Sequence, residues 1–185
     1  FSAKGRDGIL SFPLIEETLR YLGAADAPET LRRQVAGEAE TLSAQFRPRH
    51  VCKVCELDFQ GEEIFLRGTA VVLKSRTALK MLAQCHRAAL LACTLGARFD
   101  LALTAMQARD MARAVILDAC GSALVEQGCD EAEKELSARF PGRYLTDRFS
   151  PGYGDLPLEL QRDICAALDT PRRLGLHVTE SLLLN

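Results

Sequence analysis

One short stretch of the sequence gathers residue types that bind charged ligands. Residues 148–157 read Arg-Phe-Ser-Pro-Gly-Tyr-Gly-Asp-Leu-Pro. The Arg148 guanidinium presents its donors in a planar fork that suits a carboxylate or a phosphate. Pro151 and Gly152 are typical of the second and third positions of a type II turn, and the third position requires a positive φ. The stretch therefore predicts a tight turn beside a cation, with backbone that a ligand can approach closely.

A carboxylate stands three residues after the glycine of this turn. Asp155 lies where a helix is expected to begin, so it could cap that helix or receive an ammonium group. A cationic fork at Arg148 and an acid at Asp155 together suit a zwitterionic ligand. We interpret the stretch as a binding site for such a molecule, with a solvated turn as the alternative.

The cysteines form an odd set of seven without a compact framework, at positions 52, 55, 85, 93, 120, 129 and 165. Most stand among Ala, Leu and Val, where a thiol behaves as a small buried hydrophobe in a reducing compartment. The exception is Cys52-Lys53-Val54-Cys55, because this spacing can bind zinc or cycle as a dithiol. Residues 50–59 read as a strand, on which side chains three apart point to opposite faces. We expect packed cysteines, with a Cys52/Cys55 redox protein as an alternative function.

Composition narrows the functional classes further. The chain of 185 residues has a net charge of −2, so it offers no broad basic field for nucleic acid. No apolar run approaches the roughly 20 residues that span a bilayer, and the first residues lack a signal-peptide layout. We therefore expect a cytoplasmic protein that binds neither nucleic acid nor membrane. The chain starts at Phe1 and stops within an apolar run at Asn185, so we expect both ends to be trimmed.

Hydrophobic periodicity predicts the elements that must position the turn. Helices are expected over 13–23 and 28–46, which makes the first 45 or so residues helical, and a strand hairpin over 51–59 and 64–73. Ser75 predicts the N-cap of a helix that runs to about residue 95. A second long helix is expected over 110–139, in which Gly121 indicates close packing. A last strand is expected over 174–179.

These elements do not follow the βαβα alternation of a doubly wound fold. The sequence predicts one α+β domain over residues 1–185, a mainly antiparallel twisted sheet with packed helices. No G-x-G-x-x-G follows a strand, so the common dinucleotide cradle is absent from the sequence. A different kind of ligand site is therefore expected.

A second motif segment follows the turn after one helix length and reads Gly-Leu-His-Val-Thr-Glu-Ser over residues 175–181. The order Arg-x-x-Pro-Gly-Tyr, helix, Gly-x-x-x-Thr-Glu-Ser is similar to the motif of the reactivation (activation) domain of cobalamin-dependent methionine synthase. The matching residues are Arg148, Pro151, Gly152, Tyr153, Gly175, Thr179, Glu180 and Ser181. The resemblance covers residues 148–185 strongly, 75–127 moderately and the preceding part faintly, and it indicates a standalone form of that domain.

The resemblance implies a ligand and a division of labour. Domains of this family bind S-adenosylmethionine and use it to remethylate a cobalamin that has lost its methyl group. The cobalamin arrives on a partner, the cobalamin-binding methionine synthase core protein, after reduction by a flavodoxin-like protein. None of His50, His86 and His177 belongs to an Asp-x-His-x-x-Gly signature that supplies a lower cobalt ligand. This chain is therefore expected to carry neither cobalamin nor a metal of its own.

The resemblance also implies ligand-binding roles, without a catalytic side chain, because the cofactors carry the chemistry. Arg148 would clamp the donor's carboxylate, and Gly152, held by Pro151, would let the backbone reach the ligand. Tyr153 would form an aromatic wall, where a sulfonium gains modestly from the ring face. These residues form the predicted site.

Two acidic residues complete the predicted site. Glu126 resembles an acidic position near the family's ligand, and Glu180 would order the loop around Arg148 through a charge-assisted bond. Two features depart from the family pattern, because the chain has no Trp and stops before the region of a further ligand-contacting tyrosine. A module that docks on the corrinoid protein without binding S-adenosylmethionine therefore stays an alternative.

Overall fold

The computed structural model describes residues 11–182 and 184 of the chain. The chain divides into two compact units, the first formed by residues 1–49 and 94–130 and the second by residues 50–93 and 131–185. The single domain expected over residues 1–185 stays a prediction. Among the described residues, no helix combines the length and apolar character needed to cross a membrane.

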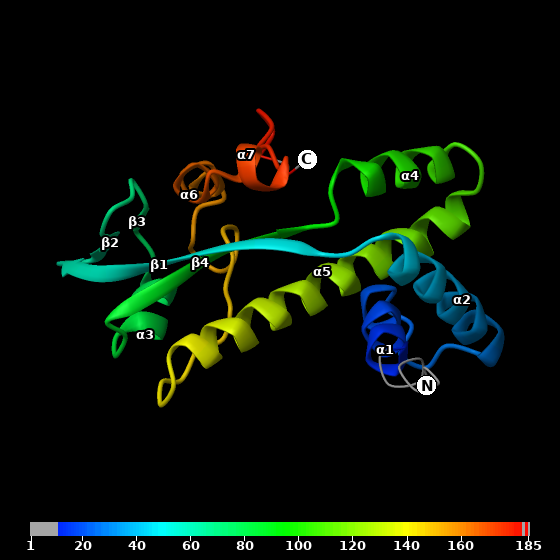
Figure 1. Cartoon of the computed structure of the whole chain (residues 1–185), viewed down its shortest axis with the longest axis horizontal. Helices are drawn as coiled ribbons and strands as arrows, with labels where there is room; N and C mark the ends of the chain where they lie inside the picture. Colours follow the sequence, from blue (N-terminus) through cyan, green and yellow to red (C-terminus); the bar gives the residue numbers. More distant parts are fainter. Residues whose placement is uncertain (1–10, 183, 185) are drawn as a thin grey trace, which may run out of the picture. The chain divides into compact units, whose positions relative to one another are not determined.

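The first unit is helical and has its own core. Helix α1 (Ser11–Tyr21) and helix α2 (Glu29–Gln45) pack side by side, as Figure 1 shows in blue. Their buried residues are Leu14, Leu19, Val35, Ala39 and Leu42. These residues recur at helical spacing, so the predicted helices over 13–23 and 28–46 are confirmed. Helix α4 (Ala97–Gln107) lies between the two long predicted helices, where no element is predicted, and adds the buried Phe99.

The long helix α5 (Met111–Arg139) begins in the first unit and confirms the helix predicted over 110–139. Its Gly121 faces the ring of Phe99 so closely that a Cβ on the glycine would lie 2.3 Å from the ring's Cζ. The Phe99 ring also meets Phe46 edge to face, with ring centroids 5.7 Å apart. The close packing predicted at Gly121 is therefore confirmed.

The second unit is built around most of a four-stranded sheet in the order β3-β2-β1-β4. Strand β1 (Arg49–Gln60) and strand β2 (Glu63–Leu66) form an antiparallel hairpin in the register Leu57↔Leu66. Strand β3 (Val72–Leu73) pairs antiparallel with β2, and β4 (Arg87–Thr94) lies beside β1 (Figure 1). The predicted α+β class with a mainly antiparallel sheet is confirmed.

The prediction of one strand over 64–73 is wrong, because the chain turns between β2 and β3. Gly68 has φ +77°, which an extended strand cannot contain. The Thr69 hydroxyl donates to the Leu66 carbonyl at 2.7 Å and accepts from the Val71 amide at 3.1 Å. These bonds satisfy the turn, so the two halves pair with each other across it.

The prediction of a helix from 76 to about 95 is correct only in its first two turns. Helix α3 (Arg76–Leu82) begins at the predicted cap, where the Ser75 hydroxyl accepts from the Ala78 amide at 3.0 Å. The chain then turns and forms β4. Its Ala-Ala-Leu-Leu-Ala-Cys run has no periodicity that separates a buried strand from a buried helix. The unpaired edge of β1 therefore decides the outcome, and the Leu57 amide donates to the His86 carbonyl at 3.0 Å.

The predicted strand over 174–179 is also wrong. Helix α6 (Leu160–Leu168) is followed by the short helix α7 (Thr170–Leu174), which Gly175 ends in a left-handed conformation with φ +70°. After it, Val178 makes one isolated bridge to Leu184. Leu174 and Leu176 are nevertheless buried. The alternating apolar residues from which a strand was expected are therefore core residues of a helix end and the loop after it. The core of this unit joins β1, β2, α6 and α7.

Candidate ligand-binding site

The predicted turn at Pro151 and Gly152 is present in the second unit. The Tyr153 amide donates to the Ser150 carbonyl at 3.0 Å, which closes a four-residue turn. Gly152 has φ +89°, as the third position of a type II turn requires. The Gly152 amide donates to the Leu156 carbonyl at 2.8 Å, and the buried Leu156 anchors the turn in the core. The local sequence thus fixes the backbone beside Arg148.

Arg148 forms an ion pair with a residue that the sequence analysis did not name. Its Nη1 lies 3.0 Å from Oε1 of Glu133 on α5, and the two side chains are 35% and 33% exposed. The next residue, Phe149, is partly buried against the core, so the arginine is held where the loop meets the unit. Arg148 is therefore a partly exposed guanidinium already oriented by a carboxylate.

Asp155 caps a helix, but not the helix that follows it in sequence. Its Oδ1 accepts from the Ser75 hydroxyl at 2.6 Å and from the Thr77 amide at 3.1 Å, and its Oδ2 accepts from the Arg76 amide at 2.6 Å. The hydrogen bond from Ser75, followed by those from Thr77 and Arg76, holds the pKa of Asp155 well below its usual range. Of the two roles predicted for this carboxylate, the structure assigns capping, and the capped helix is α3.

Tyr153 lies on the turn with a side chain that is largely in solvent. The residue is 62% exposed, and its neighbour Gly154 takes φ +60° against Thr77. An aromatic wall at this position therefore requires a ligand or partner to cover the ring.

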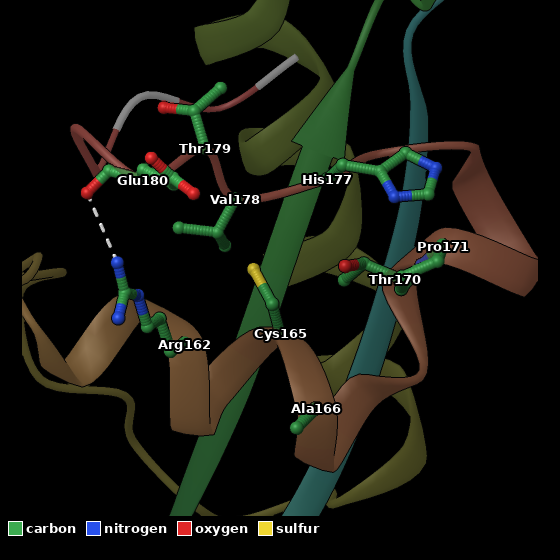
Figure 2. Close-up of a pocket in the computed structure, with 9 residues that line it drawn as sticks. All are labelled: Arg162, Cys165, Ala166, Thr170, Pro171, His177, Val178, Thr179 and Glu180. Atoms are coloured by element: carbon green, nitrogen blue, oxygen red, sulfur yellow. Dashed lines mark hydrogen bonds between the residues drawn. The ribbon is translucent and has the colours of Figure 1, made fainter.

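The second motif segment lines a pocket of about 440 Å³ on the second unit, a volume in the range of small-molecule sites. Its lining residues are Arg162, Cys165, Ala166, Thr170, Pro171, His177, Val178, Thr179 and Glu180. Figure 2 shows Arg162 reaching from α6 to the backbone of Glu180, and its Nη2 donates to that carbonyl at 3.1 Å. Figure 2 also shows the Cys165 sulfur pointing from α6 toward the 177–180 segment. Arg148 and Tyr153 are not among the lining residues.

Thr170 fixes the wall of this pocket from beneath. It is fully buried, and its hydroxyl donates to the Leu176 carbonyl at 2.9 Å. The Leu176 amide returns a bond of 3.3 Å to the Thr170 carbonyl. These bonds hold the start of the segment that carries His177 and Glu180 against α7.

Glu126 belongs to the first unit, unlike the other predicted site residues. It lies on α5, where its Oε1 accepts from the Tyr21 hydroxyl at 3.4 Å. Burial of the phenol and, second, the Glu126 charge raise the pKa of Tyr21. The described contact of Glu126 is thus with α1.

The Cys52 and Cys55 pair lies on β1, as predicted. Cys55 is buried and Cys52 is partly buried. Burial raises the pKa of both thiols, whereas a redox cysteine needs a lowered pKa. Among the residues that the structure describes, no group of three or more His, Cys, Asp and Glu side chains could hold a metal ion. This environment favours packing over dithiol chemistry.

The residues that act through contacts distant in the chain are not predictable from local motifs. Glu133 stands 15 positions before its partner Arg148, across the irregular segment after α5, and no motif links them. Arg162 and Thr170 lie within the stretch read only as a connecting helix. The sequence does contain one signal for Glu133. It is an acidic residue on the helix that precedes the turn at Arg148, and an arginine favours a carboxylate partner.

No protein-family model matches the chain, and no curated protein matches it significantly. Among solved structures, its fold is similar to the crystal structure of the MetH reactivation domain bound to AdoHcy, with a TM-score of 0.60 and 16% sequence identity. The match covers 91% of this chain and 62% of that structure, so the chain spans about three-fifths of its neighbour's length. This similarity shows that the chain has the fold of a reactivation domain.

Proposed function

We propose that the protein is a standalone reactivation-domain protein that binds S-adenosylmethionine. It supports the reductive methylation of a cobalamin that is carried by a separate methionine synthase core protein, in the cytoplasm and with a flavodoxin-like protein as reductant. The observation that carries this proposal is the fold shared with a structure that holds AdoHcy, the demethylated form of the donor. The chain would be one component of a methyltransferase system.

The motif residues fit the amino-acid end of such a donor. Arg148 is partly exposed and can meet a carboxylate, and the exposed Gly152, which has a positive φ, presents backbone without a side chain in the turn that follows. Thr179 and Glu180 line a pocket large enough for a small molecule. In this proposal the methyl group leaves the sulfonium for the cobalt of the partner, and S-adenosylhomocysteine remains.

A titration of the protein with S-adenosylmethionine in a calorimeter tests the proposal. We expect saturable binding by the wild type and a loss of about tenfold or more in Arg148→Ala, because a charge-assisted bond to the carboxylate is lost. Arg143→Ala is the matched control, since it removes an exposed arginine from the same irregular segment. Absence of saturable heat for the wild type would contradict the proposal, whereas equal affinities for the two variants would contradict only the role of Arg148.

A docking module that no longer binds the donor is the second candidate. Two observations favour a docking module. Arg148 is paired with Glu133 and Tyr153 is 62% exposed, and neither Arg148 nor Tyr153 lines the described pocket. This candidate predicts co-purification with a cobalamin-binding methionine synthase core that Arg148→Ala leaves unchanged. It also predicts no saturable heat with S-adenosylmethionine.

A further inference from the structure

Asp155 is engaged as a cap of α3, which makes it a poor acidic partner for a zwitterionic ligand. Both of its carboxylate oxygens accept hydrogen bonds at the start of α3, from Ser75, Arg76 and Thr77. These three bonds occupy most of the positions at which a carboxylate can accept, and they hold Asp155 at the start of the helix. A carboxylate with fewer hydrogen bonds is therefore the better candidate for the acidic partner.

Glu133 is a carboxylate that the structure places against Arg148, with its Oε1 3.0 Å from the Arg148 Nη1. Its helical neighbours Ala132 and Leu136 are buried, so this part of α5 is fixed in the core. Arg148, in contrast, follows an exposed segment without regular structure. Both side chains are about one-third exposed, so the ion pair lies where a ligand at the surface can reach it.

We infer that Glu133 and Arg148 together bind the α-amino acid end of the ligand. This inference rests on the proposed function and names the recognition chemistry of the same site. The Arg148 guanidinium takes the ligand's carboxylate, and the Glu133 carboxylate takes its ammonium. A guanidinium has five N–H donors and a carboxylate accepts at several positions, so each can serve the ion pair and the ligand at once.

The spacing of charges supports this arrangement. The Arg148 Nη1 and the Glu133 Oε1 are 3.0 Å apart. The ammonium nitrogen and the carboxylate carbon of an α-amino acid are about 2.5 Å apart, so the two charges of the ligand are spaced similarly to those of the ion pair. A ligand laid head to tail against the pair therefore brings each of its charges opposite an unlike charge. The four charges then alternate in sign, which is favourable for every adjacent pair.

The net charge of the proposed ligand supplies a second argument. S-adenosylmethionine carries an ammonium and a sulfonium against one carboxylate, so it is a net cation. A lone arginine would attract the carboxylate but repel the molecule as a whole. Glu133 neutralises Arg148, so the pair can bind the zwitterionic end without that repulsion.

Affinity measurements with two ligands test the inference. S-adenosylhomocysteine carries the amino-acid end, whereas 5′-methylthioadenosine has the same nucleoside thioether without it. We expect Glu133→Gln to weaken S-adenosylhomocysteine about fivefold to thirtyfold and to leave 5′-methylthioadenosine within about twofold. Glu131→Gln is the control, because it removes the same charge from an exposed position on the same helix.

The outcomes separate this inference from the proposed function. If the wild type binds S-adenosylhomocysteine and Glu133→Gln binds it equally well, the proposed function stands and the inference is wrong. A gain in affinity would make Glu133 a competitor of the ligand, and an equal loss for both ligands would give it a purely structural role. Both results overturn the inference. Absence of binding by the wild type overturns the inference together with the proposed function.

Discussion

Asp155 accepts a hydrogen bond of 2.6 Å from the hydroxyl of Ser75, a residue 80 positions earlier in the chain. Ser75 itself caps α3, so the serine and the aspartate together satisfy the amides of Arg76, Thr77 and Ala78. The turn that follows Arg148 is thereby tied to α3. The shape of the candidate site depends on a helix cap formed by two distant segments.

Replacement of Asp155 by Ala should destabilise the protein, because two helix amides and the Ser75 hydroxyl lose their acceptor. Thermal unfolding at neutral pH measures the effect as a lower midpoint. Asp147→Ala is the control, since it removes an exposed aspartate from the segment before the turn. Equal midpoints for the two variants would show that the cap contributes nothing.

The same cap predicts a pH dependence. Hydrogen bonds from Ser75, Thr77 and Arg76 lower the pKa of Asp155 in the folded state. A lowered folded-state pKa contributes stability that is present above the unfolded value of about 3.9 and is lost as pH falls below it. The wild type should therefore exceed Asp155→Ala in stability at pH 6, and the difference should shrink as the pH is lowered through 3. A constant difference over that range would contradict this assignment.

The sequence was informative where one residue type answers a local backbone need. Ser75 as a cap and Gly152 at the positive-φ position of a turn are such cases, and both lie where expected. The sequence was misleading where pairing between distant segments determines the secondary structure. Strand β4 carries an apolar run that suits a buried helix equally well, and only the edge of β1 selects the strand.

In the candidate site, too, some features follow from local residues and others depend on contacts between distant segments. The turn over 150–153 follows from a proline and a glycine, whereas the partner of Arg148 depends on how an irregular segment folds back onto α5. No local pattern encodes that return, so Glu133 was missed. The sequence is compatible with two roles for Asp155, and the position of α3 selects capping.

Gly121→Ala should lower the free energy of unfolding by about 1–3 kcal/mol, the usual cost of overpacking a core. The added methyl carbon would meet the Phe99 ring at 2.3 Å, which is too close for any side chain. Chemical denaturation measures the loss. Gly37→Ala is the control, because nothing lies within 4 Å of a Cβ at that position of α2. That control should be neutral or gain up to about 1 kcal/mol of helix propensity, and a Gly121→Ala variant as stable as it would exclude the contact.

Thr170→Val should destabilise the protein by about 1–2 kcal/mol, although it preserves the shape of the side chain. The fully buried hydroxyl donates to the Leu176 carbonyl at 2.9 Å, and valine leaves that carbonyl without the bond. Thr170→Ser keeps the hydroxyl and removes a methyl group, so it separates the hydrogen bond from the packing. Denaturant titration of the two variants decides, and a serine variant less stable than the valine variant would show that packing dominates.

Cys52 and Cys55 should react slowly with iodoacetamide in the folded protein. Burial raises the pKa of both thiols, so the reactive thiolate is scarcer at pH 8 than in an unfolded chain, where the pKa is about 8.5. Cys120, whose pKa burial raises to about 11, should label more slowly still. Mass spectrometry of labelled peptides over pH 7–10 measures each rate, with the protein unfolded in guanidinium chloride as the control. Faster labelling of Cys52 or Cys55 in the folded protein than in the unfolded one at pH 7 would revive the dithiol interpretation, because only a lowered pKa produces that order.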